Sequence, residues 1–106
     1  MNLNKLLPLT ETTFYIMLSL IEPSHGYAIM QRVEELSNNK VRVAAGTMYG
    51  AIDNLLKQKL ICEVPSNDKR RRVYTLTPEG SEVLKLEVGR IKHLVAISEN
   101  LVLGGN

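Results

Sequence analysis

The sequence lacks most of the residues on which disulfide and redox chemistry depend. Its 106 residues include one cysteine, Cys62, two histidines and no tryptophan. A single cysteine cannot form an internal disulfide, and no charged start followed by an apolar stretch and a cleavage site indicates export. The cytoplasm is therefore the expected compartment. The apolar stretches are interrupted well before the ~18 residues that a membrane span needs, so no membrane association is expected.

Recognisable catalytic arrangements are also missing. The chain has no glycine-rich phosphate loop and no cluster with metal-ligand spacing, and its two imidazoles, His25 and His93, fall in different predicted helices. No second ligand at helical spacing accompanies His25, which favours a structural or capping role for this residue. We therefore expect no enzymatic activity, no cofactor and no bound metal.

Charge is distributed unevenly along the chain. The formal net charge is only +2, yet residues 40–72 contain eight lysines and arginines against three acids. The rest of the chain is net negative. One third of the sequence thus carries the positive field that a polyanion would sense.

A basic run separates two strand-like segments. Residues 60–64 and 73–76 have strand character, and four consecutive cations, Lys69 to Arg72, precede the second segment. This pattern predicts a β-hairpin with a positively charged tip. Two strands alone are barely stable in water, so the hairpin must pack on helices. Helices with one basic hairpin are typical of a winged helix, although a charge run by itself is more often a solvated face.

Two helices are expected before the basic region. The first begins after Thr10, whose hydroxyl can accept a hydrogen bond from a free amide of the first turn. The second begins at Ser24 or His25 and ends in Ser37-Asn38-Asn39. Residues 41–43 are expected to form a short strand-like link. The apolar residues expected to share the inner face are Phe14, Met17, Leu18 and Ile21 in the first helix, and Tyr27, Met30, Val33 and Leu36 in the second.

The third predicted helix, residues 45–58, has a polar flank that is a candidate binding surface. The inner side carries Met48, Ile52, Leu55 and part of Leu56, and the opposite flank carries Thr47, Gly50, Asn54 and Lys57, with Tyr49 and Asp53 beside it. Gly50 costs about 1 kcal/mol of helix stability relative to alanine, but it lets another backbone approach closely. Ala44 and Ala45 offer no side-chain cap, which leaves first-turn amides free for a phosphate. An ordinary solvated face is the alternative.

The last predicted helix is too long and too apolar to be covered by a small domain. Thr77-Pro78-Glu79 is a strong helix start. Apolar residues then recur in alternating steps of four and three as far as about Leu101, which is a coiled-coil seam. The expected homodimer interface consists of Leu84, Val88, Ile91, Leu94, Val95, Ser98 and Leu101. The alternative is a helix that folds back on its own domain.

These elements together predict a mainly α fold with a small β-hairpin wing. The predicted organisation is a winged helix-turn-helix over residues 1–77, followed by a C-terminal dimerisation helix over residues 78–103 within the same compact unit.

Four short motifs extend the argument to a family. They are residues 9–16 (LTETTFYI), residues 25–27 (HGY), residues 46–50 (GTMYG) and residues 74–77 (YTLT). Each motif is weak alone, but their order and spacing over nearly the whole chain resemble PadR-like transcriptional regulators. The resemblance implies a dimeric winged helix-turn-helix protein, usually a repressor, whose third helix enters the major groove while the wing contacts the neighbouring backbone.

The resemblance also assigns roles to residues. Thr47, Tyr49 and Gly50 match the start of the recognition helix, and Arg71 and Arg72 match the basic pair of the wing. The predicted partner is a palindromic double-stranded DNA operator, and the alternative is an acidic protein bound by a winged-helix module. We expect base contacts from Thr47, Tyr49 and Asn54, and phosphate contacts from Lys57, Lys69, Arg70, Arg71 and Arg72.

Two departures from the family pattern bear on function. Val73 stands where the family often has an aromatic residue, which affects wing packing but leaves the cations in place. The last helix has no aromatic residue, whereas members that bind planar drugs resemble one another in stacking them between aromatics at the dimer interface. A drug-binding pore is therefore not expected. A phenolic or other small-molecule effector remains open, and so does a regulator with no ligand in this domain.

Overall fold

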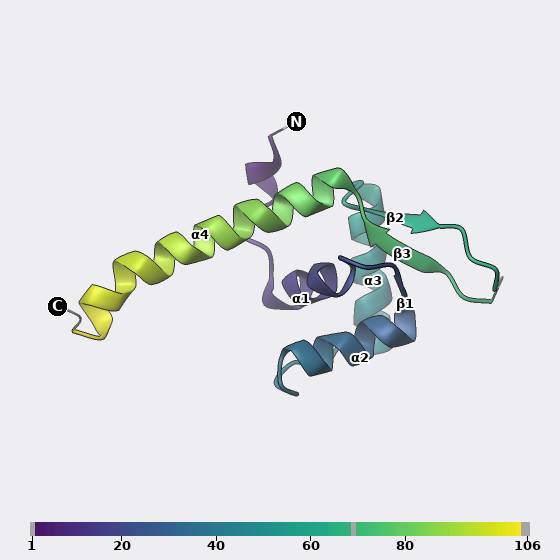
Figure 1. Ribbon diagram of the computed structural model, residues 1–106, viewed down its shortest axis with the longest axis horizontal. Coiled ribbons are helices and arrows are strands. Elements are labelled where there is room, and N and C mark those ends of the chain that lie inside the picture. The colour runs from purple at the N-terminus through teal and green to yellow at the C-terminus, as the bar shows by residue number, and fades with distance from the viewer. Residues whose placement is uncertain (1, 69, 105–106) are drawn as a thin grey trace.

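The protein is built from four α-helices, a short 3-10 helix and a small antiparallel sheet in a computed structural model, which describes residues 2–68 and 70–104 (Figure 1). The predicted fold class, mainly α with a hairpin wing, is confirmed. The elements in chain order are η1 (Leu3–Leu6), α1 (Glu11–Ser19), β1 (Ser24–His25), α2 (Gly26–Leu36), α3 (Ala45–Lys57), β2 (Ile61–Val64), β3 (Val73–Leu76) and α4 (Pro78–Val102).

Two of the four helices begin with the predicted caps. The hydroxyl oxygen of Thr10 accepts a hydrogen bond from the backbone N–H of Thr13 at 3.1 Å, and that of Thr77 accepts from Gly80 at 3.1 Å. The N-cap residues of α2 and α3 are His25 and Ala44, and neither makes a capping side-chain hydrogen bond. The first-turn amides of both helices are thus without a side-chain cap.

The sheet has the order β1-β3-β2, with both pairings antiparallel. β2, β3 and the described residues between them, 65–68 and 70–72, form the wing. The two-residue strand β1 was not predicted, and it places His25 opposite Val73. The prediction of a strand-like link at residues 41–43 was wrong. There, the backbone N–H of Val41 donates to the hydroxyl oxygen of Ser37 at 3.0 Å instead of to a neighbouring strand.

Helices α1, α2 and α3 enclose the core with β2, β3 and the start of α4. The core consists of Ile16, Met17, Leu20, Ile29, Val33, Val43, Met48, Ile52, Leu55, Leu60, Ile61, Tyr74, Val83 and Leu84. Three expected inner residues are exposed instead: Ile21, Tyr27 and Leu36. Ile21 lies beyond the end of α1, and α2 turns Gly26, Ile29 and Val33 inward, which leaves Tyr27 facing solvent.

The first half of α4 packs on the rest of the protein, and its second half extends away from it (Figure 1). Leu84, predicted as an interface residue, is buried in the core of its own chain, so the exposed apolar stripe begins at Val88. Glu87 is 1% exposed, and its carboxylate accepts from the backbone N–H of Leu9 at 2.8 Å and from the side chain of Arg90. These contacts fasten the N-terminal segment to α4. Within the described residues, no helix is long and apolar enough to cross a membrane.

Candidate nucleic-acid interface

The wing, the start of α2 and the first turns of α3 surround one pocket. Because β1 pairs with β3, the first residue of α2 lies beside the base of the wing. The pocket has a volume of about 380 Å³, and we call it the wing pocket. Its lining residues are His25, Gly26, Tyr27, Tyr49, Arg70, Arg71, Arg72 and Tyr74. Three guanidinium groups and three phenol rings thus line a hollow that opens next to the third helix.

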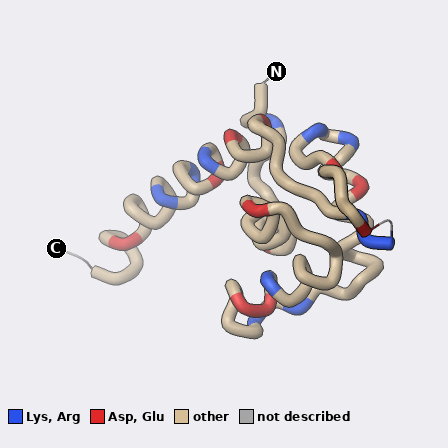
Figure 2. The backbone as a smooth tube through the Cα atoms, turned by 45° about the vertical axis from the view of Figure 1, so that its right-hand side comes forward, with Lys and Arg blue, Asp and Glu red and all other residues tan. Residues whose placement is uncertain are grey.

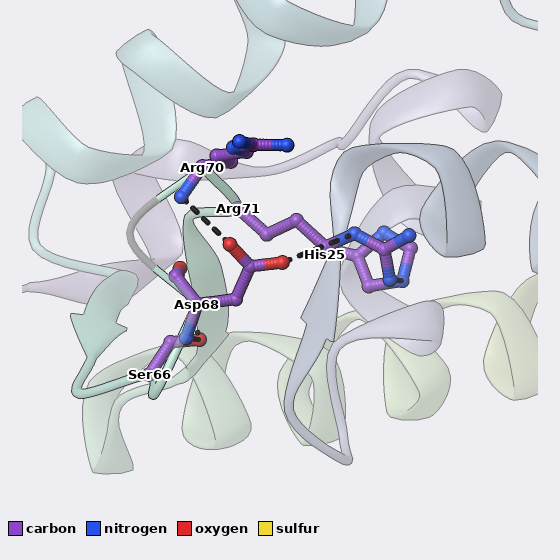
Figure 3. A network of polar contacts seen from close by, with 5 residues as sticks. All are labelled: His25, Ser66, Asp68, Arg70 and Arg71. Atoms are coloured by element: carbon purple, nitrogen blue, oxygen red, sulfur yellow. Dashed lines mark hydrogen bonds and ion pairs between the residues drawn. The ribbon is translucent and has the colours of Figure 1, made fainter.

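A polar network orders the tip of the wing (Figure 3). The backbone N–H of Arg70 donates to Asp68 Oδ1 at 2.9 Å, and the N–H of Asp68 donates to the hydroxyl oxygen of Ser66 at 3.2 Å. Arg71 reaches from Asp68 to His25: its Nε lies 3.9 Å from Asp68 Oδ2 and its Nη1 lies 3.4 Å from His25 Nε2. Arg70 directs its guanidinium group away from Asp68.

Tyr49 leans from α3 onto the first residue of α2. A Cβ atom built on Gly26 would lie 2.6 Å from the Tyr49 hydroxyl oxygen and 3.1 Å from Met48 Cε. The missing side chain of Gly26 therefore makes room for the Tyr49 ring. Tyr49 remains 52% exposed, so its ring borders the wing pocket and also faces solvent.

Tyr74 forms the back of the wing pocket. It is buried, and burial raises the pKa of its phenol above the ordinary value. The negative charge of Glu63 raises this pKa further, while Arg72 acts in the opposite direction. The Tyr74 hydroxyl is therefore protonated throughout the physiological range.

The other predicted DNA contacts on α3 do not all face the wing pocket. Thr47, Gly50, Asn54 and Lys57 are exposed, as expected. No atom outside the helix's own neighbouring backbone lies within 4 Å of a Cβ built on Gly50, so this part of the helix is open to a second molecule. Asn54 lines a different hollow of about 520 Å³, between α3 and residues 6–13. The predicted contact Lys69 lies outside the described residues.

Four residues of the wing pocket were absent from the predicted contacts: His25, Gly26, Tyr27 and Tyr74. His25 and Tyr27 belong to one of the motifs that carry the family resemblance, and Tyr74 belongs to another. Their proximity depends on the pairing of Ser24 with Tyr74 and of His25 with Val73. A strand of two residues has no detectable periodicity. The two motifs could therefore be seen in the sequence, but their contact in the folded protein could not be predicted.

The exposed half of α4 carries the remaining predicted residues. Val88, Ile91, Leu94 and Val95 are each 37% to 47% exposed, and Leu101 is more exposed still. Ser98 is exposed, and its hydroxyl donates to the carbonyl oxygen of Val95 at 3.2 Å. An apolar stripe thus runs along the part of α4 that extends away from the other described elements (Figure 1).

A basic hairpin packed beside the start of the third helix defines a winged helix-turn-helix protein of the DNA-binding regulator type. The chain belongs to the transcriptional regulator PadR-like family, whose family model matches residues 16–86. The resemblance carried by the four sequence motifs is therefore confirmed. Because the matched range runs from α1 into α4, it includes the whole wing pocket.

Individual relatives agree with this membership. An uncharacterized 37.1 kDa protein in transposon TN4556 of Streptomyces fradiae is 37% identical over 73 residues, which are 68% of this chain. The matched segment is only 20% of that relative's length. A PadR family transcription regulator from hypervirulent Clostridium difficile R20291 has a TM-score of 0.70 and 26% identity, with 86% of this chain and 97% of that chain covered.

A second similar structure is that of Bordetella bronchiseptica BpsR, whose DNA binding is regulated by 6-hydroxynicotinic acid. It has a TM-score of 0.66 and covers 86% of this chain and 65% of that chain. Its sequence identity of 19% means that the likeness shows the fold alone.

Proposed function

We propose that this protein is a transcriptional repressor that binds a palindromic double-stranded DNA operator as a homodimer. The observation that carries the proposal is the wing pocket, where Tyr49 from α3 and Arg70 to Arg72 from the wing line one hollow. Winged helices use a helix to read base edges in the major groove and positive side chains to hold the backbone. This geometry presents both kinds of group on one side of the molecule.

In this arrangement α3 reads bases and the wing contacts phosphates. Thr47 and Tyr49 lie in the first turns of α3, where helix-turn-helix proteins reach base edges. Asn54 follows Thr47 by seven residues, or about 10 Å along the helix, so it would meet different base pairs. Gly50 lies between them and allows the helix to approach the DNA closely. Phosphate contacts are assigned to Lys57, Lys69, Arg70, Arg71 and Arg72.

The exposed stripe of α4 supports the homodimer. Val88, Ile91, Leu94 and Val95 leave 37% to 47% of their surface exposed and Leu101 leaves more, and a second copy would cover this apolar surface. We therefore assign residues 1–77 to DNA binding and the exposed part of 78–103 to dimerisation, with Ser98 at the interface.

The regulation of BpsR by an aromatic acid shows that regulators of this fold can respond to small molecules. A phenolic or similar effector is compatible with the proposal. Because α4 has no Phe, Tyr or Trp, its exposed stripe does not support stacking of such a ligand at the dimer interface.

Selection of bound sequences from random duplexes tests the proposal, followed by titration of the selected duplex at several salt concentrations. Operator affinity should fall with salt at a slope of about −0.9 in log–log form per phosphate neutralised. Arg71→Ala with Arg72→Ala should make this slope shallower, while Arg32→Ala on α2 is a control that removes a cation outside the wing. If no duplex is enriched and the wing captures an acidic protein instead, the DNA-binding proposal is wrong.

A further inference from the structure

Two carboxylates lie among the arginines of the wing. Asp68 Oδ2 is 3.9 Å from Arg71 Nε, and Glu63 Oε1 is 3.9 Å from Arg72 Nη1. Figure 2 shows the basic wing tip with acidic positions directly beside it. We propose that Asp68 and Glu63 limit the affinity for DNA by holding these arginines in the free protein. DNA binding then exchanges each carboxylate for a backbone phosphate, an inference that rests on the proposed function.

The position of Arg71 supports the proposal that a carboxylate holds this arginine in the free protein. Its side chain lies between the Asp68 carboxylate and the His25 ring instead of extending freely into solvent (Figure 3). An arginine can only donate hydrogen bonds, so His25 Nε2 is the acceptor in their 3.4 Å contact. A phosphate that takes Arg71 must compete with Asp68 for it and is also repelled by the charge of Asp68.

The two carboxylate oxygens of Asp68 interact with different partners. Oδ1 accepts from the backbone N–H of Arg70 at 2.9 Å, which shapes the turn, and Oδ2 faces Arg71. An asparagine keeps an Oδ1 acceptor for the turn but carries no charge. The substitution Asp68→Asn therefore separates a role in wing structure from a role in DNA affinity, whereas Asp68→Ala would remove both.

Glu63 acts at the other side of the wing. It lies on β2 in register with Tyr74 of β3, and its charge is one of the causes that raise the pKa of Tyr74. The field of Glu63 thus reaches the wing pocket as well as Arg72. A phosphate at this pocket would meet both the attraction of Arg72 and the repulsion of Glu63.

The expected change in DNA affinity follows from the solvent exposure of the four paired side chains. All four side chains are about half exposed or more, and exposed ion pairs contribute little to folding stability. Removing one carboxylate should leave stability unchanged but should tighten DNA binding roughly three- to tenfold at low salt. The gain should shrink at high salt, because the Debye length falls from about 10 Å at 0.1 M to about 3 Å at 1 M.

The test measures binding of a fluorescent random-sequence duplex by Asp68→Asn, Glu63→Gln and the double variant, each at low and high salt. The matched control is Glu35→Gln. Glu35 is also exposed and pairs with Arg32 at 3.7 Å, but it lies on α2 outside the wing, and its removal changes the net charge by the same amount. Both wing variants should bind more tightly than the wild type, and the control should bind as the wild type does.

A double-mutant cycle shows whether the acid acts through its arginine. The gain from Asp68→Asn should largely disappear when Arg71 is already alanine. Thermal unfolding checks that each variant is folded, and Glu63→Gln on the strand tests the idea independently of the Asp68 turn. Equal gains in the wing variants and in Glu35→Gln would indicate a net-charge effect and overturn the inference.

Two other outcomes separate this inference from the proposed function. If Arg71→Ala weakens duplex binding but neither acid substitution tightens it, the restraint by carboxylates is wrong and DNA binding by the wing stands. If the wild type binds duplexes without salt dependence and Arg71→Ala has no effect, the proposed function fails and this inference fails with it.

Discussion

Tyr49 and Gly26 fit against each other, so the position of Tyr49, the base contact proposed on α3, depends on a missing side chain at the start of α2. A Cβ on Gly26 would lie 2.6 Å from the Tyr49 hydroxyl oxygen, which is closer than real Cβ atoms approach. The contact sets the direction of the Tyr49 ring over the wing pocket. It also couples the recognition helix to the strand β1, because Gly26 directly follows His25.

Gly26→Ala should therefore displace Tyr49 without unfolding the protein. The nearest atom to the new methyl group is the end of a half-exposed side chain, which can move, so the free energy of unfolding should change by less than about 1 kcal/mol. Operator affinity should fall. Combining it with Tyr49→Ala should give no further loss, because both changes remove the same placement of the ring. Full operator affinity in Gly26→Ala would show that the position of Tyr49 does not matter.

Gly80→Ala should destabilise the whole fold. A Cβ at this position would overlap the backbone carbonyl oxygen of Leu60, which cannot move like a flexible side chain and which accepts from the N–H of Thr77 at 3.0 Å. We expect a loss of about 1–3 kcal/mol or more in urea unfolding. Gly89→Ala in the same helix is the control, because no atom lies near its Cβ position. It should raise stability by up to about 1 kcal/mol.

Gly50→Leu should separate folding from DNA binding. The space around Gly50 is open, so leucine should preserve stability or raise it by about 0.5–1 kcal/mol through its higher helix propensity. The same side chain should prevent α3 from approaching the DNA, and operator binding should be lost. Gly50→Ala should give an intermediate affinity. If the leucine variant still binds the operator, a different face of α3 contacts the DNA bases.

Local signals in the sequence were sufficient for much of the fold. The caps at Thr10 and Thr77 were predicted because a hydroxyl, and in the second case also a proline, mark a helix start within a few residues. Strand β3 was predicted from its strand-like residues, and the buried face of α3 was predicted from its helical periodicity. These features depend on residues that are close together in the chain, so they can be recognised in a single sequence.

The features that were missed depend on contacts between distant segments. The face of α2 was predicted only in part: Val33 is buried as predicted, but Tyr27 is exposed, and the glycine before it, which looks like a poor core residue, packs against Tyr49. The wing pocket depends on a strand of only two residues. Glu87 looks like any charged helix residue, yet its partner at Leu9 is 78 positions away in the sequence.

The buried Glu87 should make stability depend on pH in mild acid. Its pKa is lowered from the ordinary value of 4.5, first by the hydrogen bond from Arg90, while burial acts in the opposite direction. Its contribution to stability is therefore fully present above the unfolded pKa and is lost as the pH falls through the lower folded pKa. Urea unfolding of the wild type should show stability decreasing over this acidic range.

Glu87→Gln should flatten that dependence and should cost about 1–3 kcal/mol near neutral pH, because the buried side chain loses the charge that accepts from Arg90 and from the Leu9 N–H. Glu82→Gln is the control, because Glu82 is exposed on the same helix. Equal pH profiles for Glu87→Gln and the wild type would mean that Glu87 is not responsible for the acid sensitivity.

Ile91 lies at the centre of the exposed stripe on α4, and it provides the test of the dimer. If this stripe meets a second copy, Ile91→Asp places a charge in a desolvated interface, near the same charge of the symmetry-related chain. Sedimentation should then show a monomer where the wild type is a dimer at the same micromolar concentration. His93→Asp introduces the same carboxylate on the opposite side of the helix and should leave the dimer intact.

The DNA-binding consequence distinguishes dimerisation from a general loss of structure. A dimer holds two recognition helices about 34 Å apart, or a multiple of this distance, so both half-sites are bound together. Ile91→Asp should therefore lose far more affinity for a complete operator than for a single half-site, while its thermal unfolding remains cooperative. An Ile91→Asp protein that remains dimeric, or a wild type that is already monomeric, would place the interface elsewhere on the molecule.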